Sequence, residues 1–166
     1  MVFTLANSQE GQRAGRLLLG GESKVQTLSF AGEADWAKAM PALRPIVPTV
    51  NRIVVSNSMK ALYVLGNYDV VVNANDVLES ESRREFGRDP RTGRPAIGTA
   101  DSVAKVIDMP GRTLVIVEDE KLGQPAGVTA EVVALLEANC QRVVTPKSSG
   151  VTAWLCARLM ESQLVA

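Results

Sequence analysis

Apolar runs of strand length alternate along this chain with segments of helical periodicity, and this alternation constrains the fold more than any other feature. Strand-like runs occupy residues 52–56, 68–73 and 113–117, and helical patterns occupy residues 58–65 and 99–107. A strand, a helix and a second strand in succession form a right-handed βαβ unit with parallel strands. We therefore expect a single α/β domain over residues 1–166, built on one doubly wound, mainly parallel sheet of five or six strands flanked by helices.

Further elements complete the expected order. Strand-like runs lie at residues 2–5 and 25–30, and helical patterns lie at residues 9–19, 33–43 and 76–86. The sequence Gly-Val-Thr-Ala occurs at residues 127–130 and again at 150–153, each time after a strand-like run and a polar loop. We expect two neighbouring βα units here, the second ending in an apolar helix that carries Trp154, Leu155, Leu159 and Met160. Such a helix belongs to the core or forms a contact between two copies of the chain.

The residue types present exclude several kinds of site. The chain has no histidine, which removes Ser-His-Asp and Cys-His nucleophile systems and most zinc sites. Cys140 and Cys156 lack metal-ligand spacing and lie in apolar helical patterns, so we expect two buried, reduced thiols. Low cysteine content and the lack of an export signal favour the cytoplasm. No apolar run approaches the roughly 18 residues of a membrane span, so no membrane partner is expected.

The run at 113–117 ends in carboxylates, of which Glu118 and Asp119 are the candidate catalytic residues. Ligands of parallel sheets bind at the carboxyl ends of the strands. The next helix opens near Gly127 and Thr129, where free backbone N–H groups suit a phosphate. Carboxylates beside a phosphate site suit sugar hydroxyls or a magnesium ion, so Mg²⁺ is the cofactor that this pattern suggests.

This stretch resembles the signature of type I phosphoribosyltransferases. In that family, as in LVIVEDEKLGQPAGVTAEVV, an apolar strand leads into two acidic residues, a phosphate loop and a helix. The resemblance implies that Glu118 and Asp119 contact the ribose hydroxyls of phosphoribosyl pyrophosphate, and that Gly127 and Thr129 bind its 5-phosphate. It also implies magnesium-assisted transfer. In this chain LGQPAG stands where the family carries Thr-Thr-Gly-Gly.

Two other interpretations use the same residues. An ordinary βα unit with a solvated acidic loop needs no ligand at all. Asp108, Asp119 and Lys121 also have the spacing of a magnesium-dependent nuclease core. Gly123 and Pro125 follow too soon for the hairpin strand that such a core requires, and the βα pattern argues against it.

Residues 83–98 hold five arginines, three glycines and two prolines, a composition that predicts an exposed, mobile loop. Arg88, Arg91 and Arg94 form a basic patch able to bind phosphate, nucleic-acid backbone or the acidic face of a protein partner. By the family resemblance, this loop closes over pyrophosphate. A solvated loop is the alternative. Lys+Arg and Asp+Glu number 18 each, so a bulk attraction to nucleic acid is not expected.

Residues 145–150 are a second candidate anion site. Lys147 supplies positive charge, and Ser149 can cap the helix expected after it. The GxxxxGK[ST] pattern of a P-loop is absent. Ordinary capping is the alternative.

The function expected from these residues is binding of a small phosphorylated ligand or nucleotide, with phosphoribosyltransferase-like chemistry as its most specific form. The main alternative is a non-catalytic interaction or assembly subunit. It would form homo-oligomers or bind another protein through the Arg-rich loop at 83–94 and the C-terminal helix. A nucleic-acid-binding accessory protein is a third class. The residues leave open whether the protein is an enzyme.

Overall fold

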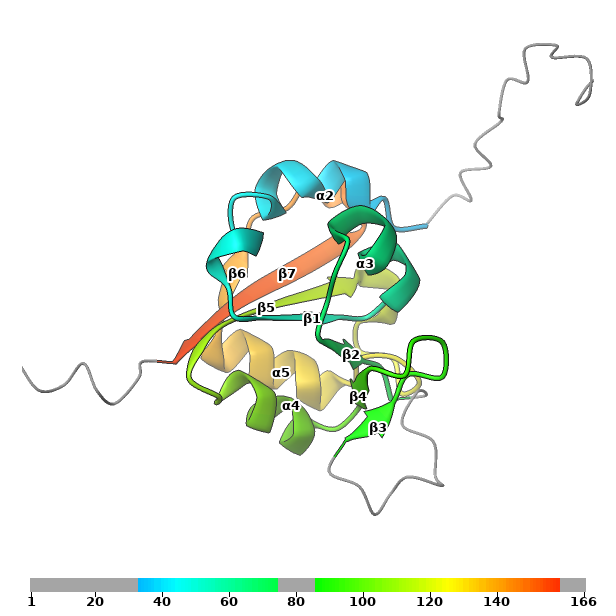
Figure 1. Ribbon diagram of the computed structural model, residues 1–166, viewed down its shortest axis with the longest axis vertical. Helices are drawn as coiled ribbons and strands as arrows, with labels where there is room; N and C mark the ends of the chain where they lie inside the picture. Colours follow the sequence, from blue (N-terminus) through cyan, green and yellow to red (C-terminus); the bar gives the residue numbers. More distant parts are fainter. Residues whose placement is uncertain (1–32, 75–85, 159–166) are drawn as a thin grey trace, which may run out of the picture. The chain divides into compact units, whose positions relative to one another are not determined.

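The computed structural model describes residues 33–74 and 86–158, which contain a seven-stranded sheet and four α-helices (Figure 1). The strands are β1 (Arg52–Val55), β2 (Val70–Val72), β3 (Gly87–Arg88), β4 (Pro95–Ile97), β5 (Gly111–Glu118), β6 (Gln141–Val143) and β7 (Val151–Arg158). The helices are α2 (Trp36–Leu43), α3 (Ser58–Leu65), α4 (Ala100–Ile107) and α5 (Ala130–Asn139). The short 3₁₀ helices are η1 (Val47–Thr49), η3 (Asp119–Lys121) and η4 (Lys147–Ser149).

The sheet has the strand order β3-β4-β2-β1-β5-β7-β6. Its central strands β4, β2, β1 and β5 are parallel to one another. At the two edges β3 pairs antiparallel with β4, β7 with β5, and β6 with β7. The predicted α/β class is confirmed, but the sheet is mixed and has seven strands, so the predictions of mainly parallel pairing and of five or six strands are wrong.

Helices cover both faces of the sheet (Figure 1). Alternate strand residues pack on opposite faces, as the pleat requires. On one face Val55, Leu114 and Ile116 form a buried cluster with Trp36 and Leu43 of α2 and with Ala61 of α3. On the other face the buried cluster joins β-strand residues to α4 and α5 and contains Val54, Val115, Val117, Val103, Val106, Val132 and Leu136.

Local signals place the helices that follow the parallel strands. Asn57 caps α3 by accepting a hydrogen bond from the N–H of Lys60, and Gly66 ends this helix in the left-handed conformation. Thr99 and Ser102 form a capping box at the start of α4. The helices predicted at 58–65 and 99–107 are therefore confirmed, as are the strands predicted around 52–56 and 113–117.

The last described element is a strand and not the predicted helix. β7 pairs with β5 along eight residues and with β6 on its other side. Helices cover both faces of the sheet, so β7 residues on both faces are buried and most of its side chains are apolar, without alternation. Trp154 and Cys156 consequently belong to the core on the α4–α5 face. The first Gly-Val-Thr-Ala segment opens a helix as expected, whereas the second opens this strand.

Cys140 and Cys156 form a disulfide. Cys140 follows α5 and immediately precedes β6, and Cys156 lies opposite it on β7. The prediction of two reduced thiols in helices is wrong because both residues belong to an antiparallel pair whose facing side chains are close together.

Several predictions fall outside the described residues. The elements expected at 2–5, 9–19 and 25–30 lie there, as does almost all of the helix expected at 76–86. All described residues belong to one compact unit, Gly32–Ala166, so the single-domain prediction is not tested for residues 1–31. Within the described part of the chain, no helix is both long and apolar enough to span a membrane.

Candidate functional site

A crevice opens at the carboxyl ends of the parallel strands, where the chain changes direction in the sheet. The carboxyl end of β1 leads into α3, and that of the adjacent parallel strand β5 leads through η3 to α5. Because α3 and α5 pack on opposite faces of the sheet, the carboxyl ends of β1 and β5 mark a topological switch point. Ligands of open α/β sheets bind at such a point.

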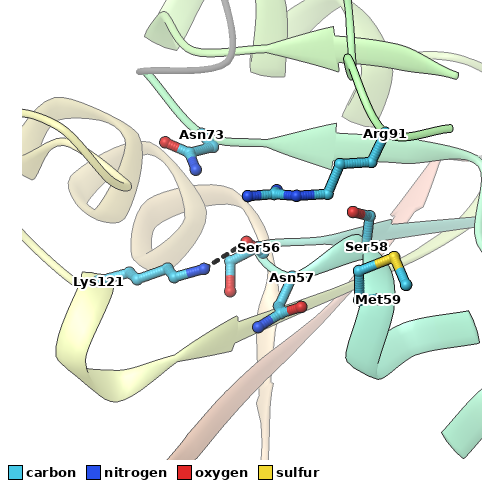
Figure 2. Close-up of a pocket in the computed structure, with 7 residues that line it drawn as sticks. All are labelled: Ser56, Asn57, Ser58, Met59, Asn73, Arg91 and Lys121. Atoms are coloured by element: carbon cyan, nitrogen blue, oxygen red, sulfur yellow. Dashed lines mark hydrogen bonds between the residues drawn. The ribbon is translucent and has the colours of Figure 1, made fainter. Parts of the chain in front are cut away.

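The crevice is lined by polar side chains and has a volume of about 400 Å³. Its lining residues are Ser56, Asn57, Ser58, Met59, Asn73, Arg91 and Lys121. Arg91 and Lys121 enter from opposite sides, and their charged ends converge toward Ser56 (Figure 2). These seven residues include two cations and no carboxylate.

The floor of the crevice is the junction between β1 and α3. Ser56 follows β1, and its side-chain oxygen accepts a hydrogen bond of 2.9 Å from the N–H of Glu118. The same backbone segment continues into Asn57, whose side-chain oxygen caps α3. The Asn57 side-chain nitrogen donates to both Glu118 oxygens at 3.2 Å. The ends of β1 and β5 are therefore fastened to one another by side chains.

Glu118 is the anchor of this region and is only 1% exposed. Its carboxylate lies 3.1 Å from the ammonium groups of both Lys60 and Lys121. Trp36 Nε1 donates a further hydrogen bond of 3.1 Å. Burial alone would raise the pKa of Glu118, but the charge of Lys121 and the hydrogen bonds from Lys60 and Asn57 bring it below its usual value.

Lys121 carries the positive charge of one wall. Its ammonium group donates to the backbone oxygen of Ser56 at 2.8 Å as well as pairing with Glu118. The loop behind it is closed by a hydrogen bond from the N–H of Val128 to the Lys121 oxygen at 2.9 Å. Gly127 packs so closely that an added Cβ would lie 2.7 Å from that oxygen. Gly127 therefore lets the loop hold Lys121 in place.

Arg91 projects from the turn between β3 and β4. Asp89 organises this turn: it is fully buried, and its carboxylate accepts hydrogen bonds from the Arg91 N–H and from the Thr92 hydroxyl. Tyr68 also donates to it at 3.2 Å. Within the described part of the chain, no residue pairs with the Arg91 guanidinium. The turn thus presents a fixed backbone and a cation that pairs with no carboxylate of residues 33–74 or 86–158.

Asp89 also faces the floor of the crevice, where Ser58 is among the groups that lower its pKa. Burial would raise the pKa of Asp89, but the hydrogen bonds from Thr92, Arg91 and Ser58 outweigh it, so the pKa lies below its usual value. Residues 86–98 form the β3–β4 hairpin and its turn, so the exposed, mobile loop predicted at 83–98 contains two short strands on either side of the turn. Residues 83–85 lie outside the described residues.

The other predicted arginines have different places. Arg94 donates to the backbone oxygen of Tyr68 and to Asn67, and its guanidinium lies 4.5 Å from the centre of the Tyr68 ring. Arg88 is exposed, and its guanidinium donates to the Gly93 oxygen at 3.4 Å. Of these three arginines, only Arg91 lines the crevice.

The remaining predicted residues do not gather around the crevice. Asp119 accepts a hydrogen bond of 2.6 Å from the Thr152 hydroxyl. Thr129 is the N-cap of α5. Ser149 is buried and donates to the Pro146 oxygen, next to the exposed Lys147. None of these four predicted residues, Asp119, Thr129, Lys147 and Ser149, is among those that line the crevice.

Sequence reasoning did not select the polar residues that follow β1 and β2. Ser56 and Asn57 come directly after the apolar run of β1, and Asn73 comes directly after β2. Polar residues at the carboxyl ends of two successive buried strands were the available signal. The sequence suggested a role for Lys121 only as part of the nuclease-like spacing with Asp108 and Asp119. In the structure its ammonium group contacts Ser56 and Glu118.

The donor set does not fit a magnesium site. Among the described residues there is no group of three or more His, Cys, Asp or Glu side chains that could hold a metal ion. Glu118 already faces two ammonium groups, which disfavour a bound cation.

The chemistry that this arrangement can perform is recognition of an anion. Two cationic side chains together with serine hydroxyls offer charged and neutral hydrogen-bond donors. No protein-family model, curated protein or solved structure matches the chain. The functional argument therefore depends on the geometry of the crevice.

Proposed function

We propose that this protein binds a small phosphorylated ligand in the crevice between β1, β2 and β5. The observation that carries the proposal is the crevice lining, which combines Arg91 and Lys121 with no carboxylate. Hydrogen bonds that involve a charged partner contribute about 1.5–3 kcal/mol each, roughly twice as much as neutral ones. A phosphate group has enough oxygens to engage both cations and a neighbouring hydroxyl or amide.

Preorganisation supports this proposal. Glu118 holds Lys121 and Asn57 from behind, on the side away from the lining, and Asp89 holds the backbone at Arg91. Side chains that are already held lose less conformational freedom when a ligand binds, so more of the contact energy appears as affinity.

The phosphoribosyltransferase-like form of the proposal is more specific and needs its own test. Glu118 and Asp119 were its ribose-binding residues, and they are engaged with lysines and with Thr152. Phosphoribosyl pyrophosphate, with and without Mg²⁺, is therefore included among the ligands to be measured. Release of pyrophosphate in the presence of an acceptor base would support transfer, whereas binding without release would support a binding protein.

The central test replaces Arg91 by Met, which keeps the length of the side chain and removes its charge. We expect calorimetry with inorganic phosphate, ribose 5-phosphate and phosphoribosyl pyrophosphate to show binding to the unchanged protein. We expect about tenfold or greater weakening in Arg91→Met, since one charged hydrogen-bond partner is lost. Arg91 has no described partner, so the fold is expected to be retained.

Two matched controls locate the site. Arg88→Met removes the same charge from the same hairpin, outside the crevice lining. Lys147→Met removes the charge of the other anion site expected from the sequence. Both variants should bind as the unchanged protein does. Equal affinity in Arg91→Met and the unchanged protein, or loss of binding in Lys147→Met, would place the ligand elsewhere and overturn the proposal.

A further inference from the structure

We infer that the ligand is a nucleotide whose phosphate occupies the crevice and whose base lies against Met59 and Tyr63 of α3. This inference rests on the proposed function and specifies the class of ligand. It starts from a surface that the phosphate site leaves unused. Met59 lines the crevice and is 56% exposed, and Tyr63, one helical turn further, is 92% exposed.

Met59 and Tyr63, which we call the shelf, are exposed side chains on one face of α3. Residues four apart lie on the same face of a helix, with Cβ atoms about 6 Å apart. Helical side chains lean toward the helix N-terminus, which here is the end at the crevice. Tyr63 therefore lies on the side of α3 that also carries Met59, and Met59 itself borders the polar lining.

The chemistry of the shelf complements that of the crevice. An aromatic ring and a polarisable thioether both make favourable contacts with the face of a flat aromatic group. A nucleotide joins such a group to a phosphate through a sugar. Inorganic phosphate or a sugar phosphate would leave Met59 and Tyr63 in water.

The test compares ligands that differ only in the base. Calorimetry is performed with ribose 5-phosphate and with AMP, GMP, CMP and UMP, on the full chain. We expect at least one nucleotide to bind about tenfold more tightly than ribose 5-phosphate, a factor typical of stacking one base on an aromatic side chain. Tyr63→Ala should remove this advantage, and Tyr63→Phe should keep it because the ring remains.

The controls separate this inference from the proposed function. Met109→Ala removes another exposed methionine, one outside the crevice lining, and should change nothing. If ribose 5-phosphate and all four nucleotides bind equally, the base shelf is wrong and the phosphate site stands. The same holds if the nucleotide advantage survives in Tyr63→Ala. If none of these ligands binds, the proposed function itself fails.

Discussion

At the scale of single residues, Glu118 is the side chain whose role the structure changes most. The sequence places it at the carboxyl end of a buried strand, where a ligand contact is the natural expectation. In the structure its carboxylate is surrounded by Lys60, Lys121, Asn57 and Trp36. A buried carboxylate with this many partners holds the crevice walls in position. Its effect on a ligand is exerted through Lys121 and Asn57.

This role predicts how stability depends on pH. The pKa of Glu118 is lower in the folded protein than its ordinary value of about 4.3. Its contribution to stability is therefore complete above that ordinary value and is lost as the pH falls through the lower folded value. Glu118→Gln removes the contribution. We expect it to lower the free energy of unfolding at pH 7 by about 3 kcal/mol, with a smaller deficit near pH 3.

Urea denaturation at both pH values measures this effect. Glu120→Gln is the matched control, because Glu120 is an exposed carboxylate two residues away. It should behave as the unchanged protein does. A Glu118→Gln variant with unchanged stability at pH 7 would contradict the anchoring role.

At the scale of elements, the disulfide fastens the edge strand β6 to β7. β6 has only three residues and pairs with a neighbour on one side, so its own hydrogen bonds hold it weakly. The disulfide closes a loop with a sequence separation of 16 residues. In the chain-entropy account a loop of this size stabilises the folded state by about 3 kcal/mol.

Reduction should therefore shift the urea midpoint of the unchanged protein to a lower concentration. The double variant Cys140→Ser, Cys156→Ala provides the control, since reductant has nothing to act on in it. We expect its midpoint to be the same with and without dithiothreitol. An unchanged midpoint for the natural sequence under reducing conditions would show that β6 is held without the bond.

At the scale of the whole molecule, the predictions that succeeded depend on neighbouring residues. Asn57 and Gly66 delimit α3 by local capping, and Thr99 does the same for α4. The prediction of a helix in place of β7 was wrong because helices cover both faces of this strand, so its apolar residues follow one another without alternation. Periodicity cannot distinguish a strand buried on both faces from a buried helix.

The candidate site likewise combines residues that local sequence signals identify with residues that only long-range contacts bring together. Glu118 could be selected because it ends an apolar run, but Trp36, its hydrogen-bond partner, is 82 residues away in the sequence. The crevice joins residues that follow β1, β2 and β5 to a residue of the β3–β4 turn. Only the strand order brings these segments together. The sequence therefore identified Arg91 as one of three similar arginines and could not say which of them lines a site.

The position of Asp89 predicts how ligand binding affects the stability of the β3–β4 turn. Its carboxylate accepts hydrogen bonds from the Arg91 N–H and from Tyr68 and faces Ser58 at the start of α3, so the turn and the floor of the crevice meet at one buried group. Binding that requires the folded turn must, by reciprocity, lower the population of states in which the turn has opened. Amide hydrogen exchange should report this as slower exchange at residues 89–94 in the presence of ligand.

The matched variant for this experiment is Asp89→Asn, which retains the shape of the side chain and removes its charge. We expect faster exchange in the turn and weaker ligand binding together, with little change in the exchange of α5. If ligand slowed exchange in α5 and left the turn unaffected, ligand binding would not be coupled to the turn through Asp89. Ligand affinity and the rate of amide exchange in the turn should therefore change together, because both depend on how often the turn opens.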